Sequence, residues 1–170
     1  MALNAFLTCP ELDGRQKQVI SLGCGFDPTA FQLLSDPVLR DQFALYIDVD
    51  FGDLTTRKRN MILNADELCD LIGLDANAAN PTAPKNALHT EKYHLLPCDL
   101  TQMDQLERLL TAIKGFSFEH PTLLISECVL TYVPTKQSDF ILSSLAHRFD
   151  NVTLIIYEQI HPGTLYIHID

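Results

Sequence analysis

Two glycines that directly follow an apolar run are the most informative residues of this chain for chemistry. Gly23 and Gly25 follow the run 19–22, and the Asp27-Pro28 pair behind them is suited to begin a helix. Glycine tolerates positive φ angles and lets a ligand approach the backbone where a Cβ would block it. The pattern predicts a tight turn at the entrance of a nucleotide-type site; a plain turn after any parallel strand is the alternative.

The turn departs from the dinucleotide fingerprint because Pro28 stands where G-x-G-x-x-G requires its third glycine. A pyrophosphate resting on a closely packed helix N-terminus is therefore disfavoured, as is a nicotinamide-dependent dehydrogenase. A nucleoside ligand without phosphate groups fits the pattern better.

Four acidic side chains stand at the ends of later apolar runs: Asp48, Asp50, Asp99 and Glu127. Ligands of doubly wound sheets bind beyond the carboxyl ends of the strands, so these side chains are candidates for ligand contacts. Asp50 lies about 25 residues beyond the glycine turn, where a carboxylate can accept both hydroxyls of a ribose. Asp48 lies farther from the crevice, and we interpret it as a solvated or capping carboxylate.

Asp99 and Leu100 are suited to an adenine ring. The carboxylate can accept from the amino group, the next backbone N–H can meet a ring nitrogen, and the leucine can cover the base. The alternative is that Asp99 caps the helix that begins there, for which Thr101 is also a candidate.

The elements that would position these residues alternate along the chain. Helical patterns separate five strand-like apolar runs, at 19–22, 43–49, 93–96, 122–125 and 152–157. This alternation predicts an α/β fold, a mostly parallel sheet with crossover helices on both faces. The segment 74–90 has no periodicity and is expected to form a surface loop.

Two of the helices are clear from their apolar stripes. The helix after Leu100 is expected to end at Gly115, and its apolar face comprises Met103, Leu106, Leu110 and Ile113. A second helix is expected from about 135 to 148, with Phe140, Ile141, Leu145 and Phe149 facing inward.

The bulk composition narrows the class of protein. With 170 residues, 46% of them hydrophobic, the chain is expected to form one domain, 1–170. No apolar run approaches the roughly 20 residues that span a bilayer, and the N-terminus lacks a signal-like pattern. We therefore expect a cytoplasmic monomer without membrane contact. The five cysteines and six histidines lack C-x-x-C and H-x-x-x-H spacing, which argues against disulfides and metal.

The net charge of −10 opposes binding to nucleic acid. The one basic cluster is Arg57-Lys58-Arg59, and we interpret it as a solvated helix face.

Around these residues the sequence resembles the leucine carboxyl methyltransferase family. The matching blocks are LGCG at 22–25, YIDVDF at 46–51, TRK at 56–58, CDL at 98–100, PTLLISECVL at 121–130 followed by Tyr132, and YEQ at 157–159. They extend over residues 18–159. The PTLLISECVL block is highly characteristic, whereas most methyltransferases of this fold share the glycine turn.

The resemblance implies a Rossmann-like, S-adenosylmethionine-dependent methyltransferase fold. It also implies methylation of the C-terminal leucine carboxylate of protein phosphatase 2A catalytic subunits. In such an enzyme the glycine turn would contact the methionine portion of the cofactor, Gly23 directly, and Asp50 would contact the ribose. Asp99 and Leu100 would contact the adenine. Glu127 would line the pocket near the sulfonium, with a capping or structural acid as the alternative.

This acceptor explains why no catalytic residue is nominated. A peptide carboxylate has a pKa of about 3.3 to 3.7 and is already an anionic nucleophile at neutral pH. Family members carry further segments at both ends, so we expect a chain truncated at both ends, with incomplete C-terminal strands. Residues 165–167 are a candidate cover for the sheet edge or a sixth strand. A non-catalytic binding module of this fold and a tRNA wybutosine-modifying relative remain as alternatives.

Overall fold

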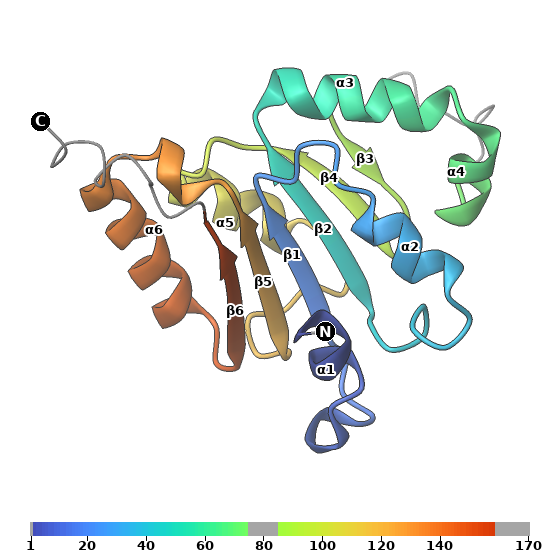
Figure 1. Ribbon diagram of the computed structural model, residues 1–170, viewed down its shortest axis with the longest axis horizontal. Helices are drawn as coiled ribbons and strands as arrows, with labels where there is room; N and C mark the ends of the chain where they lie inside the picture. The colour runs from blue at the N-terminus through green and yellow to red at the C-terminus, as the bar shows by residue number, and fades with distance from the viewer. Residues whose placement is uncertain (1, 75–84, 159–170) are drawn as a thin grey trace, which may run out of the picture.

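A computed structural model describes residues 2–74 and 85–158, which form an α/β fold around a six-stranded sheet (Figure 1). The strands are β1 (Gln18–Leu22), β2 (Leu45–Asp50), β3 (Leu88–His89), β4 (Tyr93–Pro97), β5 (Thr122–Glu127) and β6 (Val152–Tyr157). Their order in the sheet is β3-β4-β2-β1-β5-β6, and β3 alone runs antiparallel to its neighbour. The five strands predicted from sequence and the mostly parallel sheet are confirmed.

Helices cover both faces of the sheet, as predicted. They are α1 (Ala2–Leu7), α2 (Thr29–Ser35), α3 (Gly52–Leu63), α4 (Asp66–Leu71), α5 (Met103–Thr111) and α6 (Thr135–Arg148), with two short 3₁₀ turns, η1 (Pro10–Leu12) and η3 (Leu130–Tyr132). Helices α1, α2, α3 and α4 pack on one face of the sheet through one apolar core. Helices α5 and α6 pack on the other face through a second core. Alternate residues of β1 supply the two cores, Val19 to the first and Ile20 to the second. Every residue of β1 and β2 is buried, as in parallel sheets covered on both sides.

The sequence missed strand β3, which lies inside the segment predicted to be a loop. This strand has only two residues and pairs with β4 through Leu88 and His89. A strand this short leaves no alternating pattern in the sequence, so only pairing with its neighbour defines it. The suggested cover at 165–167 lies outside the described residues.

The two helices recognised from apolar stripes are present, with three corrections. The first of them, α5, ends at Thr111 and not at Gly115. Thr101 does not cap α5, because that helix begins at Met103 and follows Gln102, whose side chain makes no cap bond. Phe140 does not face inward, since it is 56% exposed while Ile141 and Leu145 are buried. Consecutive helical residues point about 100° apart, and the narrow buried face of α6 includes Ile141 and Leu145 but not Phe140.

None of the helices that the structure describes is both long enough and apolar enough to cross a membrane.

Candidate functional site

A pocket opens where the order of the strands reverses. Strand β1 lies between β2 and β5. Strands β2, β3 and β4 lie on one side of β1, and the later strands β5 and β6 lie on the other side. Loops that leave the parallel strands at their carboxyl ends gather at one edge of the sheet (Figure 1). The pocket at this edge has a volume of about 400 Å³, within the range of small-molecule sites.

The pocket brings together five of the six site residues predicted from sequence. They are Gly23, Gly25, Asp50, Asp99 and Leu100, and they come from the ends of β1, β2 and β4. The sixth, Glu127, is exposed at the end of β5 and does not line the pocket, although the next residue, Cys128, does.

The glycine turn needs glycine at both positions, for different reasons. Gly23 and Gly25 have φ angles of +66° and +47°, which L side chains rarely adopt. A Cβ on Gly23 would lie 2.5 Å from Cγ2 of Val129, so this glycine permits the close approach of the loop after β5. A Cβ on Gly25 would meet nothing within 4 Å. The turn is confirmed, and Asp27 Oδ1 accepts from the N–H and hydroxyl of Thr29 as α2 begins.

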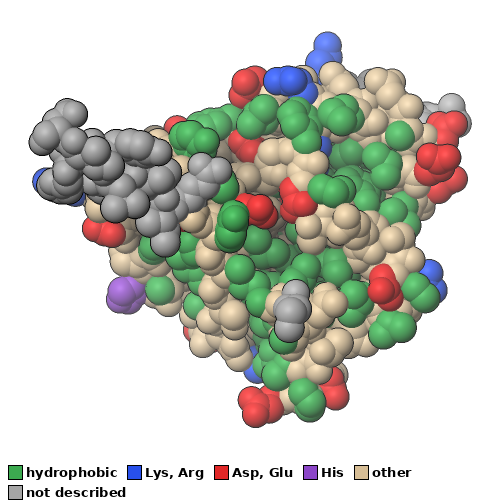
Figure 2. Space-filling view, viewed as in Figure 1, with side chains coloured by type: hydrophobic (Ala, Val, Ile, Leu, Met, Phe, Trp, Pro, Cys, Tyr) green, Lys and Arg blue, Asp and Glu red, His purple; other side chains and the backbone are tan. Residues whose placement is uncertain are grey.

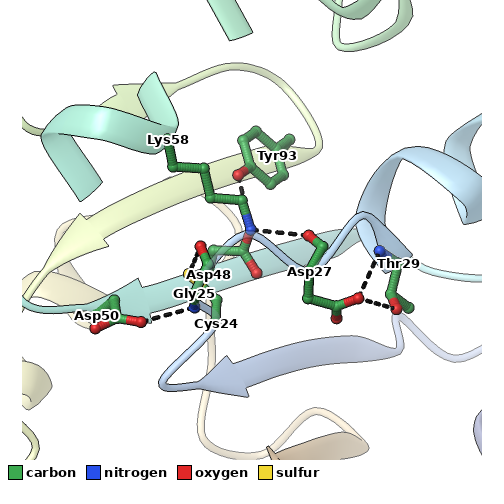
Figure 3. A network of polar contacts seen from close by, with 8 residues as sticks. All are labelled: Cys24, Gly25, Asp27, Thr29, Asp48, Asp50, Lys58 and Tyr93. Atoms are coloured by element: carbon green, nitrogen blue, oxygen red, sulfur yellow. Dashed lines mark hydrogen bonds and ion pairs between the residues drawn. The ribbon is translucent and has the colours of Figure 1, made fainter. Parts of the chain in front are cut away.

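Asp50 fixes the turn from the neighbouring strand. Its Oδ2 accepts from the backbone N–H of Gly25 at 2.7 Å, and its Oδ1 accepts from the N–H of Phe51, also at 2.7 Å (Figure 3). Each carboxylate oxygen has a second lone pair, so both keep acceptor capacity toward the pocket. Asp50 therefore orders the site and remains able to accept from a ligand.

Asp48 is not the solvated or capping carboxylate that the sequence indicated. It is 1% exposed, and its Oδ2 lies 2.7 Å from Nζ of Lys58 and accepts from the hydroxyl of Tyr93 at 2.7 Å (Figure 3). Lys58 also donates to the backbone oxygen of Asp27 at 3.0 Å. The interpretation of Lys58 as part of a solvated basic face is therefore wrong. Buried charges need such partners, and α3 brings Lys58 over strand β2 to meet the carboxylate.

Burial and charge act in opposite directions on this pair. Burial raises the pKa of Asp48 despite the adjacent ammonium. At Lys58 burial lowers the pKa, but the neighbouring groups, Asp48 foremost, together outweigh burial and the pKa is raised. The lysine is therefore charged at neutral pH. It ties α3, β2 and the glycine turn together below the pocket.

Two buried thiols near the pocket are not nucleophiles. Burial, reinforced by Asp48, strongly raises the pKa of Cys24. Burial and the nearby Asp99 raise the pKa of Cys98 to about 11. Both thiols stay protonated at neutral pH, and the thiolate is the reactive form of cysteine.

Asp99 orders the turn after β4 and does not cap a helix. Its Oδ1 accepts from the backbone N–H of Thr101 at 2.9 Å and from the Thr101 hydroxyl at 2.8 Å. Leu100, 7% exposed, packs into the second core and forms part of the pocket surface. A carboxylate and an apolar side chain thus lie side by side in the pocket lining.

Sequence reasoning missed an apolar part of the pocket. Phe51 and Leu54 line it from the start of α3, and Val129, Tyr132, Val133 and Pro134 line it from the loop after β5. Phe51 and Tyr132 are 55% and 83% exposed. The run of apolar residues directly after Glu127-Cys128 was the available signal, because loops at the carboxyl edge form the ligand site.

Within residues 2–74 and 85–158, no group of three or more His, Cys, Asp or Glu side chains is arranged to hold a metal ion.

Comparisons with known proteins agree with this geometry. The family described as leucine carboxyl methyltransferase matches residues 4–146, which include every residue that lines the pocket. A leucine carboxyl methyltransferase 1 homolog of Arabidopsis thaliana is 33% identical over 153 residues, or 90% of this chain. Leucine carboxyl methyltransferase 1 of Caenorhabditis elegans is 32% identical over 161 residues, or 92% of this chain. The human tRNA wybutosine-synthesizing protein 4 is 36% identical over 147 residues, or 85% of this chain.

These relatives are longer than this chain. The matched regions span 44% of the Arabidopsis protein, 46% of the nematode protein and 20% of the human protein. The match of the family to most of the chain, the mostly parallel sheet and the pocket at its carboxyl edge point to the same assignment. The chain belongs to the leucine carboxyl methyltransferase family.

Proposed function

We propose that this chain is the S-adenosylmethionine-binding core of a cytoplasmic methyltransferase. Its acceptor in this proposal is the C-terminal leucine carboxylate of protein phosphatase 2A catalytic subunits. One observation carries the proposal: five residues chosen from the sequence as cofactor contacts, from three different strand ends, line one pocket at the strand-order reversal. Membership of the family and the names of the Arabidopsis and nematode relatives support the reaction class.

The residues of the pocket fit this cofactor chemically. In the proposal Asp50 holds the ribose, Asp99 and Leu100 hold the adenine, and the backbone at Gly23 meets the methionine portion. Carboxylates are favourable neighbours for a ligand that carries sulfonium and ammonium charges. Apolar side chains such as Val129 provide surface for the uncharged parts of the ligand.

The chemistry requires little from the chain beyond binding and orientation. When bound, S-adenosylmethionine supplies an electrophilic methyl group. The acceptor carboxylate is ionised at neutral pH, so no general base is needed, and the protonated thiols of Cys24 and Cys98 do not compete as nucleophiles. Rate then depends on alignment of the reactants and exclusion of water. In the proposal Phe51 and Tyr132, which are exposed in the pocket lining, cover the bound acceptor.

Calorimetric titration with S-adenosylmethionine tests the cofactor assignment. We expect saturable binding near one site per chain, and Asp50→Ala should weaken it by about tenfold or more, because hydrogen bonds to a charged group are lost. Asp41→Ala is the matched control, since Asp41 is exposed and pairs with Arg40 and Lys92 at the surface. Equal affinities of the two variants would count against the site.

A transfer assay tests the acceptor. With labelled cofactor, we expect methylation of a phosphatase C-terminal peptide that ends in a leucine carboxylate and none of the same peptide with a C-terminal amide.

A tRNA-modifying function is the second candidate, because relatives named tRNA wybutosine-synthesizing protein 4 are 34% and 36% identical to this chain. Label appearing in tRNA and not in the peptide would favour it. Cofactor binding without transfer to either acceptor would favour a non-catalytic binding module.

A further inference from the structure

The loop that follows β5 forms one wall of the pocket and contains an unusual backbone conformation. We call residues 128–132 the β5 wall; Cys128, Val129 and Tyr132 of this segment line the pocket. Cys128 has a φ angle of +52° and is the one non-glycine residue with positive φ among the described residues. Such a conformation is unfavourable for an L residue and persists only where neighbouring contacts impose it.

Glu158 supplies those contacts from the end of the neighbouring strand. It directly follows β6, and its Oε1 accepts from the backbone N–H groups of Val129 and Leu130 at 3.0 and 2.9 Å. The N–H of Cys128 donates to the backbone oxygen of Tyr157 at 2.8 Å. The end of β6 therefore binds three successive amides of the β5 wall.

The two carboxylate bonds do more than satisfy free amides. Leu130 begins η3, and the first N–H groups of a helical turn have no partner within the turn. A carboxylate forms stronger bonds to such groups than a neutral acceptor. The second oxygen, Oε2, is buried and has no hydrogen-bond partner in the part of the chain that the structure describes. Within the described residues, the two bonds of Oε1 are the ones that offset the burial of Oε2.

The position of Val129 matters directly for the glycine turn. A Cβ on Gly23 would lie only 2.5 Å from Val129 Cγ2, so the wall and the turn are packed against each other. A shift of Val129 would change the space beside Gly23, where the proposed function places the methionine portion of the cofactor. Glu158 itself does not line the pocket.

We propose that Glu158 is a positioning residue of the pocket: through the amides of Val129 and Leu130 it holds the β5 wall in its ligand-binding shape. The identity of the ligand, S-adenosylmethionine, rests on the proposed function, whereas the clamp itself does not. The role requires an acceptor oxygen, and an amide side chain keeps one, so it can replace the carboxylate although its hydrogen bonds are weaker.

Three variants test the proposal. Their affinities for S-adenosylmethionine are compared by calorimetric titration, well below the unfolding temperature of each variant. Glu158→Leu removes the acceptor and should weaken binding by about tenfold or more. Glu158→Gln keeps an oxygen for both amides and should stay within about threefold of the unmodified protein. Ile155→Ala is the matched control, because Ile155 lies on the same strand, packs on the first core and does not contact the wall amides. It should lower the unfolding temperature without changing affinity.

Amide hydrogen exchange followed by NMR tests the clamp without any ligand. The amides of Val129 and Leu130 should be protected in the unmodified protein and in Glu158→Gln, and should exchange rapidly in Glu158→Leu. Retained protection in Glu158→Leu overturns the proposal, as does an equal loss of affinity in Ile155→Ala. If the unmodified protein binds no S-adenosylmethionine, the proposed function fails, and the exchange data alone decide on the clamp.

Discussion

At the scale of single residues, the glycine turn and the acidic residue of the next strand define the site. Gly23 and Gly25 both have positive φ, yet only Gly23 is packed against another side chain. Asp50 joins the two strands by accepting from the N–H of Gly25. The presence of glycine explains the turn. The loop after β5 explains why a side chain is excluded at Gly23 by packing and at Gly25 only by its φ angle.

Alanine substitutions of the two glycines should therefore differ in stability. Both variants incur the strain of positive φ, about 1–2 kcal/mol. Gly23→Ala also forces its Cβ against Val129, and overpacking of this kind costs a further 1–3 kcal/mol or so. Urea unfolding should show a clearly larger loss for Gly23→Ala than for Gly25→Ala. Equal losses would mean that Val129 moves aside freely.

Breaking the buried ion pair should be costly because one charge is left behind. Lys58→Met leaves the buried carboxylate of Asp48 with the hydroxyl of Tyr93 as its remaining partner, and we expect a loss of about 3–5 kcal/mol in unfolding free energy. The double variant Lys58→Met/Asp48→Leu should recover most of that loss.

Arg57→Met is the control for this experiment. Arg57 is exposed, with its guanidinium over the ring of Phe26, and its replacement should cost less than about 1 kcal/mol. A double variant no more stable than Lys58→Met would contradict the assigned role of the pair.

At the scale of elements, the short antiparallel strand β3 brings His89 beside His94 of β4. Nδ1 of His89 lies 3.0 Å from Nδ1 of His94, and His94 is 5% exposed. One ring must donate and the other accept, which requires at least one neutral imidazole. Burial lowers the pKa of His89, and burial together with His89 lowers the pKa of His94 to about 4.

The lowered pKa of His94 predicts a loss of stability in acid. The unfolded state takes up a proton near pH 6.5 and the folded state only near pH 4, so the contribution is complete above pH 6.5 and declines as the pH falls toward 4. Between pH 7.5 and 4.5 the loss from this group should be about 2–3 kcal/mol. Denaturant titrations at the two pH values should show a correspondingly smaller loss for His94→Asn.

His147→Asn provides the comparison, because His147 is exposed on α6. It should show the same decline between the two pH values as the unmodified protein. The assignment fails if His94→Asn declines just as steeply.

At the scale of the whole molecule, the charge distribution bears on the choice of acceptor. The chain has 22 acidic against 12 basic residues, and Lys58 and Lys17 are buried, so fewer positive charges reach the surface. Figure 2 shows acidic side chains spread over the face drawn, with basic side chains few and separated. A surface of this kind repels a phosphate backbone.

The excess of acidic over basic residues predicts that the chain alone does not bind tRNA at physiological salt. Non-specific binding depends on neutralised phosphates, and dissociation constants weaker than about 10⁻⁴ M are expected without a basic surface. A gel-shift titration with tRNA checks this directly. A saturable shift would contradict it and would favour the tRNA-modifying alternative.

The sequence by itself determined five of the six strands, their alternation with helices, the glycine turn and five of the residues that line the pocket. These features depend on local properties: apolar runs define buried strands, glycine defines the turn, and strand ends define the functional edge. Gly23 and Asp50 were found in this way because each directly follows an apolar run, and Asp99 was found because it stands three residues beyond one.

Only the tertiary structure decided which side chains meet across separate elements. Lys58 and Asp48 form a buried pair because α3 lies over β2, and nothing in the basic run around Lys58 distinguishes it from its exposed neighbour Arg57. Glu158 and Val129 are 29 residues apart in sequence, and they meet because β6 lies beside β5. Contacts of this kind depend on the pairing and packing of distant segments, which local sequence patterns do not encode.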